Sequence, residues 1–153
     1  CFPSLRFLLS KPGDLIKICG PNNHWAVYIG NGFVVHFGAP NSPSASSSGE
    51  VDGIVKKEKI QHVAGEYSWR VNNSYDEEYK PVSPDEIVKK ACSLVGVSLT
   101  YHLTKYNSEH FATEMRYGKT ESRLAYTRSL GFSVLCSRTY QARCKMLLSD
   151  EDK

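Results

Sequence analysis

The sequence predicts an α+β fold in which an antiparallel sheet packs against helices, and three observations lead to this prediction. Apolar runs typical of strands, separated by turn signals, fill the first half of the chain. Two segments with helical signals follow them. The third observation is size, because 153 residues with 41% hydrophobic and 23% charged content suit one soluble domain with its own core. Strands first and helices afterwards are typical of α+β domains.

Five strands are expected in the first half of the chain. The turn signal Lys11-Pro12-Gly13-Asp14 precedes the first of them, and Gly30-Asn31-Gly32 separates the second from the third. Residues 38–50 are rich in glycine, proline and serine, so we expect a mobile loop there. The expected strands are 15–18, 24–29, 33–37, 53–60 and 67–72.

The helix expected at 83–95 has signals at both of its ends. Ser83 is the N-cap, Pro84 occupies the first helical position and Glu86 completes a capping box. An apolar stripe follows along one face, and Gly96 ends the helix. A second helix is expected to begin at Asn107 and to end near residue 118.

The hairpin of the second and third strands could adopt two registers. With the two-residue loop Asn31-Gly32, His24 and His36 would face opposite sides of the sheet. With the three-residue loop Gly30-Asn31-Gly32, both histidines share one face as diagonal neighbours, and six large apolar residues share the other. Only this register builds a single buried surface, so we expect it. The six apolar residues are Trp25, Val27, Ile29, Phe33, Val35 and Phe37.

Composition argues against several classes of site and partner. The net charge of +3 is too weak and scattered for nucleic acid, although it slightly favours an anionic membrane surface. The five cysteines are odd in number and show no paired spacing, so we expect free thiols in a reducing compartment. His62, His102 and His110 lie at no recognisable ligand spacing, so neither a metal nor another cofactor is expected. No apolar run approaches the roughly 20 residues of a membrane span.

The stretch Tyr106-Asn107-Ser108-Glu109-His110-Phe111 raises the question of what Ser108 does. Asn107 as N-cap would place Ser108 in the first turn of a helix. Backbone N–H groups and the helix dipole favour negative charge there, which suits a thiolate or an oxyanion. A serine after an N-cap is also an ordinary way to start a helix. Taken alone, this stretch leaves both interpretations open.

Five blocks follow one another along the chain. They are Pro12-Gly13-Asp14-Leu15-Ile16, then His24-Trp25-Ala26-Val27-Tyr28-Ile29-Gly30 with His36 twelve residues after His24, then Ile54-Val55-Lys56-Lys57-Glu58, Val71-Asn72-Asn73 and Asn107-x-Glu109-His110-Phe111. In this order they resemble the lecithin:retinol acyltransferase-like family, and most closely its phospholipase A/acyltransferase branch. The resemblance runs from about residue 12 to residue 118 and is highly specific.

The resemblance implies a circularly permuted papain-like domain with its histidines on strands and its nucleophile opening a helix. It implies that His24 is the general base and that His36 is the second imidazole, which orients and polarises it. Position 108 would hold the nucleophile, where the family has a cysteine. An alcohol is harder to ionise than a thiol by roughly five or more pKa units, or about 7 kcal/mol at 1.36 kcal/mol per unit. In a site shaped for sulfur we therefore expect Ser108 to be a disabled nucleophile.

The resemblance also implies an activity and a setting. The expected activity is that of a phospholipase A or N-acyltransferase, which acts on a glycerophospholipid through an acyl-enzyme and needs no cofactor. We expect one domain over residues 1–153, monomeric and cytoplasmic, and able to lie peripherally at a membrane. The branch usually ends in a hydrophobic anchor, whereas residues 119–153 are polar and basic. Either an anchor has been removed or the chain is a soluble relative.

Two other functions remain open at this point. The first is a non-catalytic module, cellular or viral in origin, that keeps the cleft to bind a lipid or a protein. The second is a papain-like peptidase or amidase, which the shared site geometry permits but the specific blocks disfavour.

Overall fold

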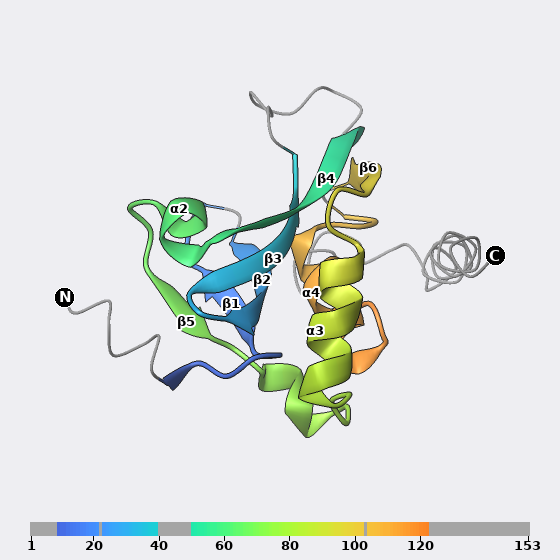
Figure 1. Ribbon diagram of the computed structural model, residues 1–153. Helices are drawn as coiled ribbons and strands as arrows, with labels where there is room; N and C mark the ends of the chain where they lie inside the picture. The colour runs from blue at the N-terminus through green and yellow to red at the C-terminus, as the bar shows by residue number, and fades with distance from the viewer. Residues whose placement is uncertain (1–8, 22, 40–49, 103, 123–153) are drawn as a thin grey trace.

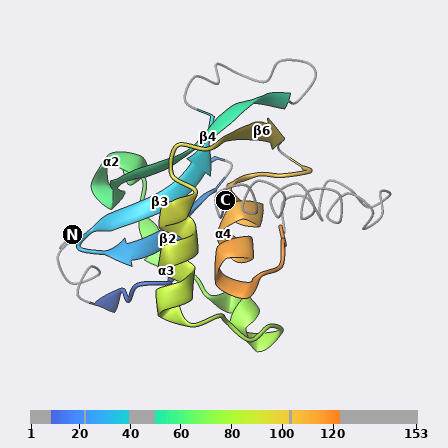
Figure 2. The same ribbon diagram turned by 45° about the vertical axis from the view of Figure 1, so that its right-hand side comes forward.

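The computed structural model describes residues 9–21, 23–39, 50–102 and 104–122. Within these ranges, six antiparallel strands form one sheet in the order β5-β1-β2-β3-β4-β6. Helices α3 and α4 lie on one side of this sheet and the short α2 on the other (Figures 1 and 2). The α+β fold is thus confirmed.

The elements are β1 (Leu15–Ile18), β2 (His24–Gly30), β3 (Phe33–Gly38), β4 (Glu50–Lys59), α2 (Ile60–Ala64), β5 (Trp69–Val71), the 3₁₀ helix η1 (Ser74–Glu77), α3 (Pro84–Ser93), β6 (Ser98–His102) and α4 (Ser108–Tyr117).

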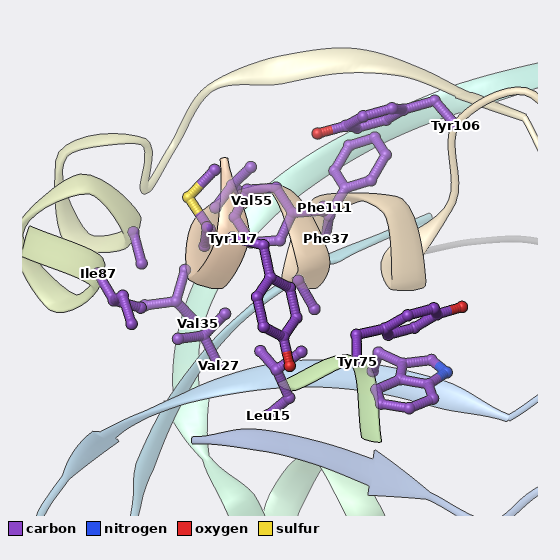
Figure 3. Close-up of a cluster of buried hydrophobic side chains, with 14 residues drawn as sticks. Leu15, Val27, Val35, Phe37, Val55, Tyr75, Ile87, Tyr106, Phe111 and Tyr117 are labelled. Atoms are coloured by element: carbon purple, nitrogen blue, oxygen red, sulfur yellow. The ribbon is translucent and has the colours of Figure 1, made fainter. Parts of the chain in front are cut away.

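Alternate residues of the central strands supply two apolar clusters, one on each face of the sheet. The larger cluster lies under α3 and α4, and Figure 3 shows Ile87 of α3 and Phe111 of α4 in it with the side chains of the strands. The smaller cluster lies under α2 and includes Ala26, Tyr28 and Ile60. Because both faces are buried, the register of β2 and β3 decides which side chains reach each cluster.

The predicted register of the hairpin is confirmed in the strand bodies, and its loop is corrected. Ala26 pairs with His36 and Val27 with Val35, as the shared apolar face required. A bulge between Tyr28 and Gly30 then shifts the register, so that Gly30 pairs with Phe33. The turn is therefore Asn31-Gly32, two residues with φ of 55° and 79°, and not the expected three-residue loop. An Asn-Gly pair suits such left-handed turns, and the bulge absorbs the extra residue.

The predicted N-caps of both helices are confirmed, but α3 ends at Ser93 with Leu94 as its C-cap, earlier than the expected residue 95, and only the Ser83 half of the expected capping box is present. The Ser83 hydroxyl accepts the N–H of Glu86 at the start of α3, and Asn107 caps α4. Gly118 ends α4 with φ of 70°, a left-handed conformation that favours glycine.

The strand predictions need several corrections, and of the expected strand 67–72 only Trp69–Val71 form β5. Ile60 was expected to end a strand, but it begins α2, where its side chain is fully buried and its N–H donates to the Gly32 carbonyl. Neither α2 nor β6 was predicted. Of the expected 38–50 loop, Gly38 ends β3 and Glu50 begins β4, while 40–49 lie outside the described residues.

The C-terminal end of α4 is tied to the start of the sheet by Arg116. Its guanidinium donates to the Gly13 carbonyl at 2.9 Å and to both carboxylate oxygens of Asp76 at 3.0 and 2.8 Å. The Tyr117 hydroxyl donates to Asp76 as well, at 2.6 Å. A bidentate arginine–carboxylate pair has a fixed geometry, so this cluster sets where α4 lies along the sheet.

We expect Gly53→Ala to destabilise the fold by about 1–3 kcal/mol, the usual cost of overpacking a core. A Cβ at Gly53 would lie 2.7 Å from two ring atoms of Phe37 and 3.0 Å from the Cβ of Tyr101. Phe37 is fully buried and has no room to withdraw. The urea unfolding midpoint measures the effect. Gly20→Ala is the matched control, because its Cβ would meet only the Tyr67 ring at an ordinary 3.7 Å. Equal midpoints for the two variants would contradict the prediction.

Two of the predicted free thiols fall within the described residues. Cys19 and Cys92 are both free. The remaining three, Cys1, Cys136 and Cys144, lie outside the described residues. In the described part of the chain, no helix is both long enough and apolar enough to cross a membrane.

Candidate active site

The two histidines expected on one face of the hairpin are in direct contact. His24 Nε2 and His36 Nδ1 are 2.8 Å apart, and the two rings meet edge to face. His36 is buried, and His24 opens β2. Because His36 pairs with Ala26, the two histidines are diagonal neighbours across β2 and β3. The packing of the apolar face therefore positions both imidazoles.

A carboxylate continues this contact on the next strand. His36 Nε2 lies 2.6 Å from Oε2 of Glu58. Val34 pairs with Glu58 and His36 with Lys56, so Glu58 is the diagonal neighbour of His36 on β4. The other oxygen of Glu58 lies 3.0 Å from Nδ1 of His62, which is four residues further along the chain, in α2. His24, His36 and Glu58 thus form a row that crosses three strands, and we call it the imidazole row.

Ser108 is the first residue of α4 and is 3% exposed. Its Oγ accepts a hydrogen bond from the N–H of Trp25 at 3.2 Å, between residues 83 positions apart in the chain. Trp25 directly follows His24, so the hydroxyl lies one residue along β2 from the imidazole row. The structure brings the three predicted site residues to one region, and their catalytic roles remain predictions.

The start of α4 is held by side-chain hydrogen bonds around Ser108. Asn107 Oδ1 accepts the N–H groups of Glu109 and His110 at 2.9 and 3.2 Å. The His110 ring closes a capping box by accepting the N–H of Asn107 at 3.1 Å. His110 therefore works as a helix cap here, since its ring stacks on Tyr106 and does not extend the imidazole row.

Tyr101 of β6 is a further contact of Ser108. Burial raises the pKa of the Tyr101 phenol, and hydrogen bonds with the backbone and side chain of Ser108 partly oppose that shift. The phenol therefore stays protonated at neutral pH. Tyr101 also lines a pocket of about 280 Å³ together with His24. The other lining residues are Ile18, Gly20, Pro21, Asn23, Val63 and Tyr67. This pocket is mostly apolar and carries no residue that is charged at neutral pH.

Burial keeps both imidazoles of the row neutral at neutral pH. Burial, with the neighbouring His36, lowers the pKa of His24 to about 3. Burial also lowers the pKa of His36, although Glu58 opposes that shift. A neutral imidazole has a lone pair that can accept a proton, which is the form that a general base needs before it reacts. In the described ranges, no group of three or more His, Cys, Asp or Glu side chains is placed to hold a metal ion.

Comparison with known proteins identifies the relatives of this chain. The family profile for lecithin retinol acyltransferase matches residues 9–121. The chain belongs to this family. It is 43% identical to phospholipase A and acyltransferase 3 of Mus musculus in an alignment of 119 residues that covers 73% of this chain and 74% of that protein. It is 42% identical to the Homo sapiens protein of the same name, with the same coverage. Phospholipase A and acyltransferase 4 of Homo sapiens is 40% identical in an alignment of 117 residues that covers 72% of this chain and 71% of that protein.

Sequence reasoning missed two residues of this family member's candidate site. Glu58 stands in one of the blocks that carry the resemblance, but its contact depends on how β4 pairs with β3 across a long connection. Tyr101 lies on β6, a strand that was not predicted at all. Alternation along β4 puts Glu58 on the same face of the sheet as Lys56, the partner of His36, but that pairing comes from the structure and not from the sequence. For Tyr101 the available signal was the polar/apolar alternation of Ser98-Leu99-Thr100-Tyr101-His102, which is typical of a strand.

We expect the folded state to lose stability as pH falls below the ordinary histidine value of 6.5. The folded pKa values of His24 and His110 are lowered to about 3 and about 4. Between these values and 6.5 the unfolded chain binds the protons and the folded chain does not, so the stabilisation present above 6.5 is lost towards pH 3 to 4. Each imidazole contributes a slope of up to about 1.4 kcal/mol per pH unit.

Urea unfolding between pH 7 and pH 4 measures this slope. His24→Gln should make the slope shallower by removing one of the histidines whose folded pKa is lowered. His62→Gln is the control, because its side chain is 78% exposed. An unchanged slope in His24→Gln would contradict the prediction.

Proposed function

We propose that this chain is a phospholipase A or N-acyltransferase-type domain that works through an acyl-enzyme, with Ser108 in the nucleophile position. One observation carries the proposal: the Ser108 hydroxyl accepts the N–H of Trp25, the residue next to the His24–His36 pair. A nucleophile at a helix N-terminus beside an oriented imidazole is the arrangement that acyl transfer needs. The names of the relatives support a phospholipid substrate and both hydrolysis and acyl transfer.

In the first step, the side chain at position 108 attacks the carbonyl carbon of the glycerophospholipid ester, and His24 takes its proton. The negative charge that develops on the carbonyl oxygen is favoured near the first-turn N–H groups of α4. Collapse of the tetrahedral intermediate breaks the ester bond. The lysophospholipid oxygen leaves with the proton held by His24, and the acyl group stays on residue 108.

In the second step, water or an amine attacks the acyl-enzyme. His24 takes a proton from the attacking group and returns it to the side chain at position 108 as the acyl group departs. Water yields a free fatty acid and an amine yields an N-acyl product. Both outcomes regenerate the starting protonation states, so no cofactor is consumed.

The form with Ser108 is proposed to be weak or inactive. The family resemblance places a cysteine at this position, and a thiol ionises far more readily beside a neutral imidazole than an alcohol does. Ser108 Oγ accepts a hydrogen bond from Trp25, which would stabilise an anion there. That single N–H does not offset an ionisation cost of about 7 kcal/mol, because a charge-assisted hydrogen bond contributes only about 1.5–3 kcal/mol.

A binding module is the second candidate, and the apolar pocket beside His24 favours it. Such a pocket can hold part of an acyl chain whether or not the nucleophile works. In that case the protein as it stands would bind phosphatidylcholine, and Ser108→Cys would bring no turnover.

Product analysis tests the proposal. The Ser108→Cys form is supplied with a short-chain phosphatidylcholine alone, and then with the same lipid plus phosphatidylethanolamine as the amine. We expect fatty acid and lysophospholipid in the first case and an added N-acyl product in the second. Binding of the lipid without either product would overturn the enzymatic proposal and leave the binding module.

A further inference from the structure

We propose that Glu58 is a positioning residue that fixes the tautomer of both histidines, so that Nδ1 of His24 is the nitrogen that accepts the proton of the nucleophile. This inference rests on the proposed function for its catalytic meaning. The tautomers themselves are a property of the protein as it stands.

The inference begins at the carboxylate end of the imidazole row. An ionised carboxylate can only accept hydrogen bonds, so the 2.6 Å contact with Glu58 requires His36 to carry a proton on Nε2. A neutral imidazole has one N–H, which leaves Nδ1 of His36 as an acceptor. The 2.8 Å contact between His36 Nδ1 and His24 Nε2 then requires His24 to donate from Nε2. The remaining nitrogen of His24, Nδ1, carries a free lone pair.

The protonation states that this chain of hydrogen bonds needs agree with the surroundings of each group. Burial would raise the pKa of Glu58, but the hydrogen bonds and charges of His36 and His62 outweigh it and lower that pKa. Burial lowers the pKa of His36 despite the opposing effect of Glu58. Glu58 is therefore ionised and His36 neutral at neutral pH. The other charged or titratable groups that act on this pair are Lys56 and His62.

If the hydrogen bonds of the imidazole row ran in the opposite direction, Nδ1 of His24 would carry a proton and could not act as a base. If His36 carried a proton on Nδ1, it would donate to His24 Nε2, and His24 would hold its own proton on Nδ1. Without the charge of Glu58, nothing in the row selects between these two arrangements, because a glutamine at 58 can accept through its oxygen or donate through its nitrogen. The carboxylate therefore selects one direction for both hydrogen bonds of the row. Glu58 would act like the carboxylate of a catalytic triad, except that a second imidazole, His36, lies between it and the base.

The first experiment reads the tautomers directly. Ring ¹⁵N chemical shifts of histidine distinguish a protonated nitrogen from an unprotonated one, and His24→Gln and His36→Gln assign the signals. In the protein with Ser108, we expect the proton on Nε2 of both rings at pH 7.5. In Glu58→Gln, we expect both tautomers of each ring to be populated, whereas Glu77→Gln, a change at an exposed carboxylate, should leave the shifts unchanged.

The second experiment tests the consequence in the Ser108→Cys background. Glu58→Gln should lower kcat by about 10- to 100-fold, the range typical of a lost outer hydrogen-bond partner, with little change in KM. Glu58→Asp keeps the charge and should recover part of the rate. Glu77→Gln, a change at an exposed carboxylate outside the row, should stay within about twofold, the spread that a screened surface group allows.

The two experiments separate the possible failures. A proton on Nδ1 of His24 in the unaltered protein, or unchanged tautomers in Glu58→Gln, would overturn the inference whatever the activity. Correct tautomers with an inactive Ser108→Cys form would uphold the inference about Glu58 and overturn the proposed function. An unfolded Glu58→Gln form would be recognised from its circular dichroism, and Glu58→Asp then supplies the tautomer comparison: retained Nε2 protons uphold the inference and mixed tautomers overturn it.

Discussion

Ser108→Cys is expected to raise the rate of phosphatidylcholine hydrolysis by at least about 10²- to 10³-fold. The ionisation of the side chain costs roughly 7 kcal/mol less for a thiol than for an alcohol. About half of this difference, ~3.5 kcal/mol, reaches the barrier, because a more basic nucleophile attacks faster once it is ionised. The protein with serine should hydrolyse phosphatidylcholine at close to the background rate. It has the first turn of α4 and the imidazole row, but it lacks a nucleophile that ionises easily.

Intact mass and two further variants make this result specific to the site. The Ser108→Cys form should accumulate a mass increase of one acyl group, and this adduct should disappear when His24 is also changed to alanine. Ser93→Cys is the matched control, because it adds a thiol at an exposed position of α3 far from the imidazole row in sequence. Substantial turnover by the serine form, lost in Ser108→Ala, would instead show that Ser108 is itself a working nucleophile.

Phe111→Ala is expected to destabilise the domain by about 3–5 kcal/mol, the usual cost of removing a buried phenylalanine side chain. Phe111 is 1% exposed, and its ring centroid lies 6.1 Å from that of Phe37 on β3. It is one of the side chains through which α4 packs on the sheet, one turn after Ser108 (Figure 3). The loss would therefore also loosen the start of the helix that carries Ser108.

Urea unfolding measures this loss, and Tyr67→Ala is its control. Tyr67 is 53% exposed, so its removal should cost well under about 1 kcal/mol. A Phe111→Ala protein with the stability of the Tyr67→Ala protein would mean that α4 is held mainly by Arg116 and by the Asn107 cap.

The parts of the site that local physics determines could be predicted from the sequence. The shared apolar face of the hairpin required His24 and His36 to be neighbours, and Asn107 required Ser108 to open a helix. Both depend on residues that are close in sequence. The bulge before Gly30 was missed, because the pairing rule alone does not say which residue leaves the ladder.

The remaining contacts of the site depend on pairings that no local signal encodes. Glu58 reaches His36 only because β4 returns beside β3 in one particular register. Tyr101 reaches Ser108 from β6, a strand of mixed exposure whose partner β4 lies about 50 residues earlier in the chain. The sequence Ser98-Leu99-Thr100-Tyr101-His102 alternates polar and apolar residues, but it is short and none of its residues is fully buried, so its pairing with β4 and not its own pattern fixes where the strand lies.

The Arg116 cluster has a consequence for the order in which the site is assembled during synthesis. The imidazole row is complete once β4 has left the ribosome, but the Gly13–Arg116 bond joins residues 103 positions apart. Contacts of such separation form late, since a long loop must close before they contribute. A nascent chain that has not yet released Arg116 therefore has its base and carboxylate but no placed nucleophile. The proposed acyl-transfer site is therefore complete only after Arg116 has been released, so a chain truncated before it would expose the apolar sheet face under α4 without a placed nucleophile.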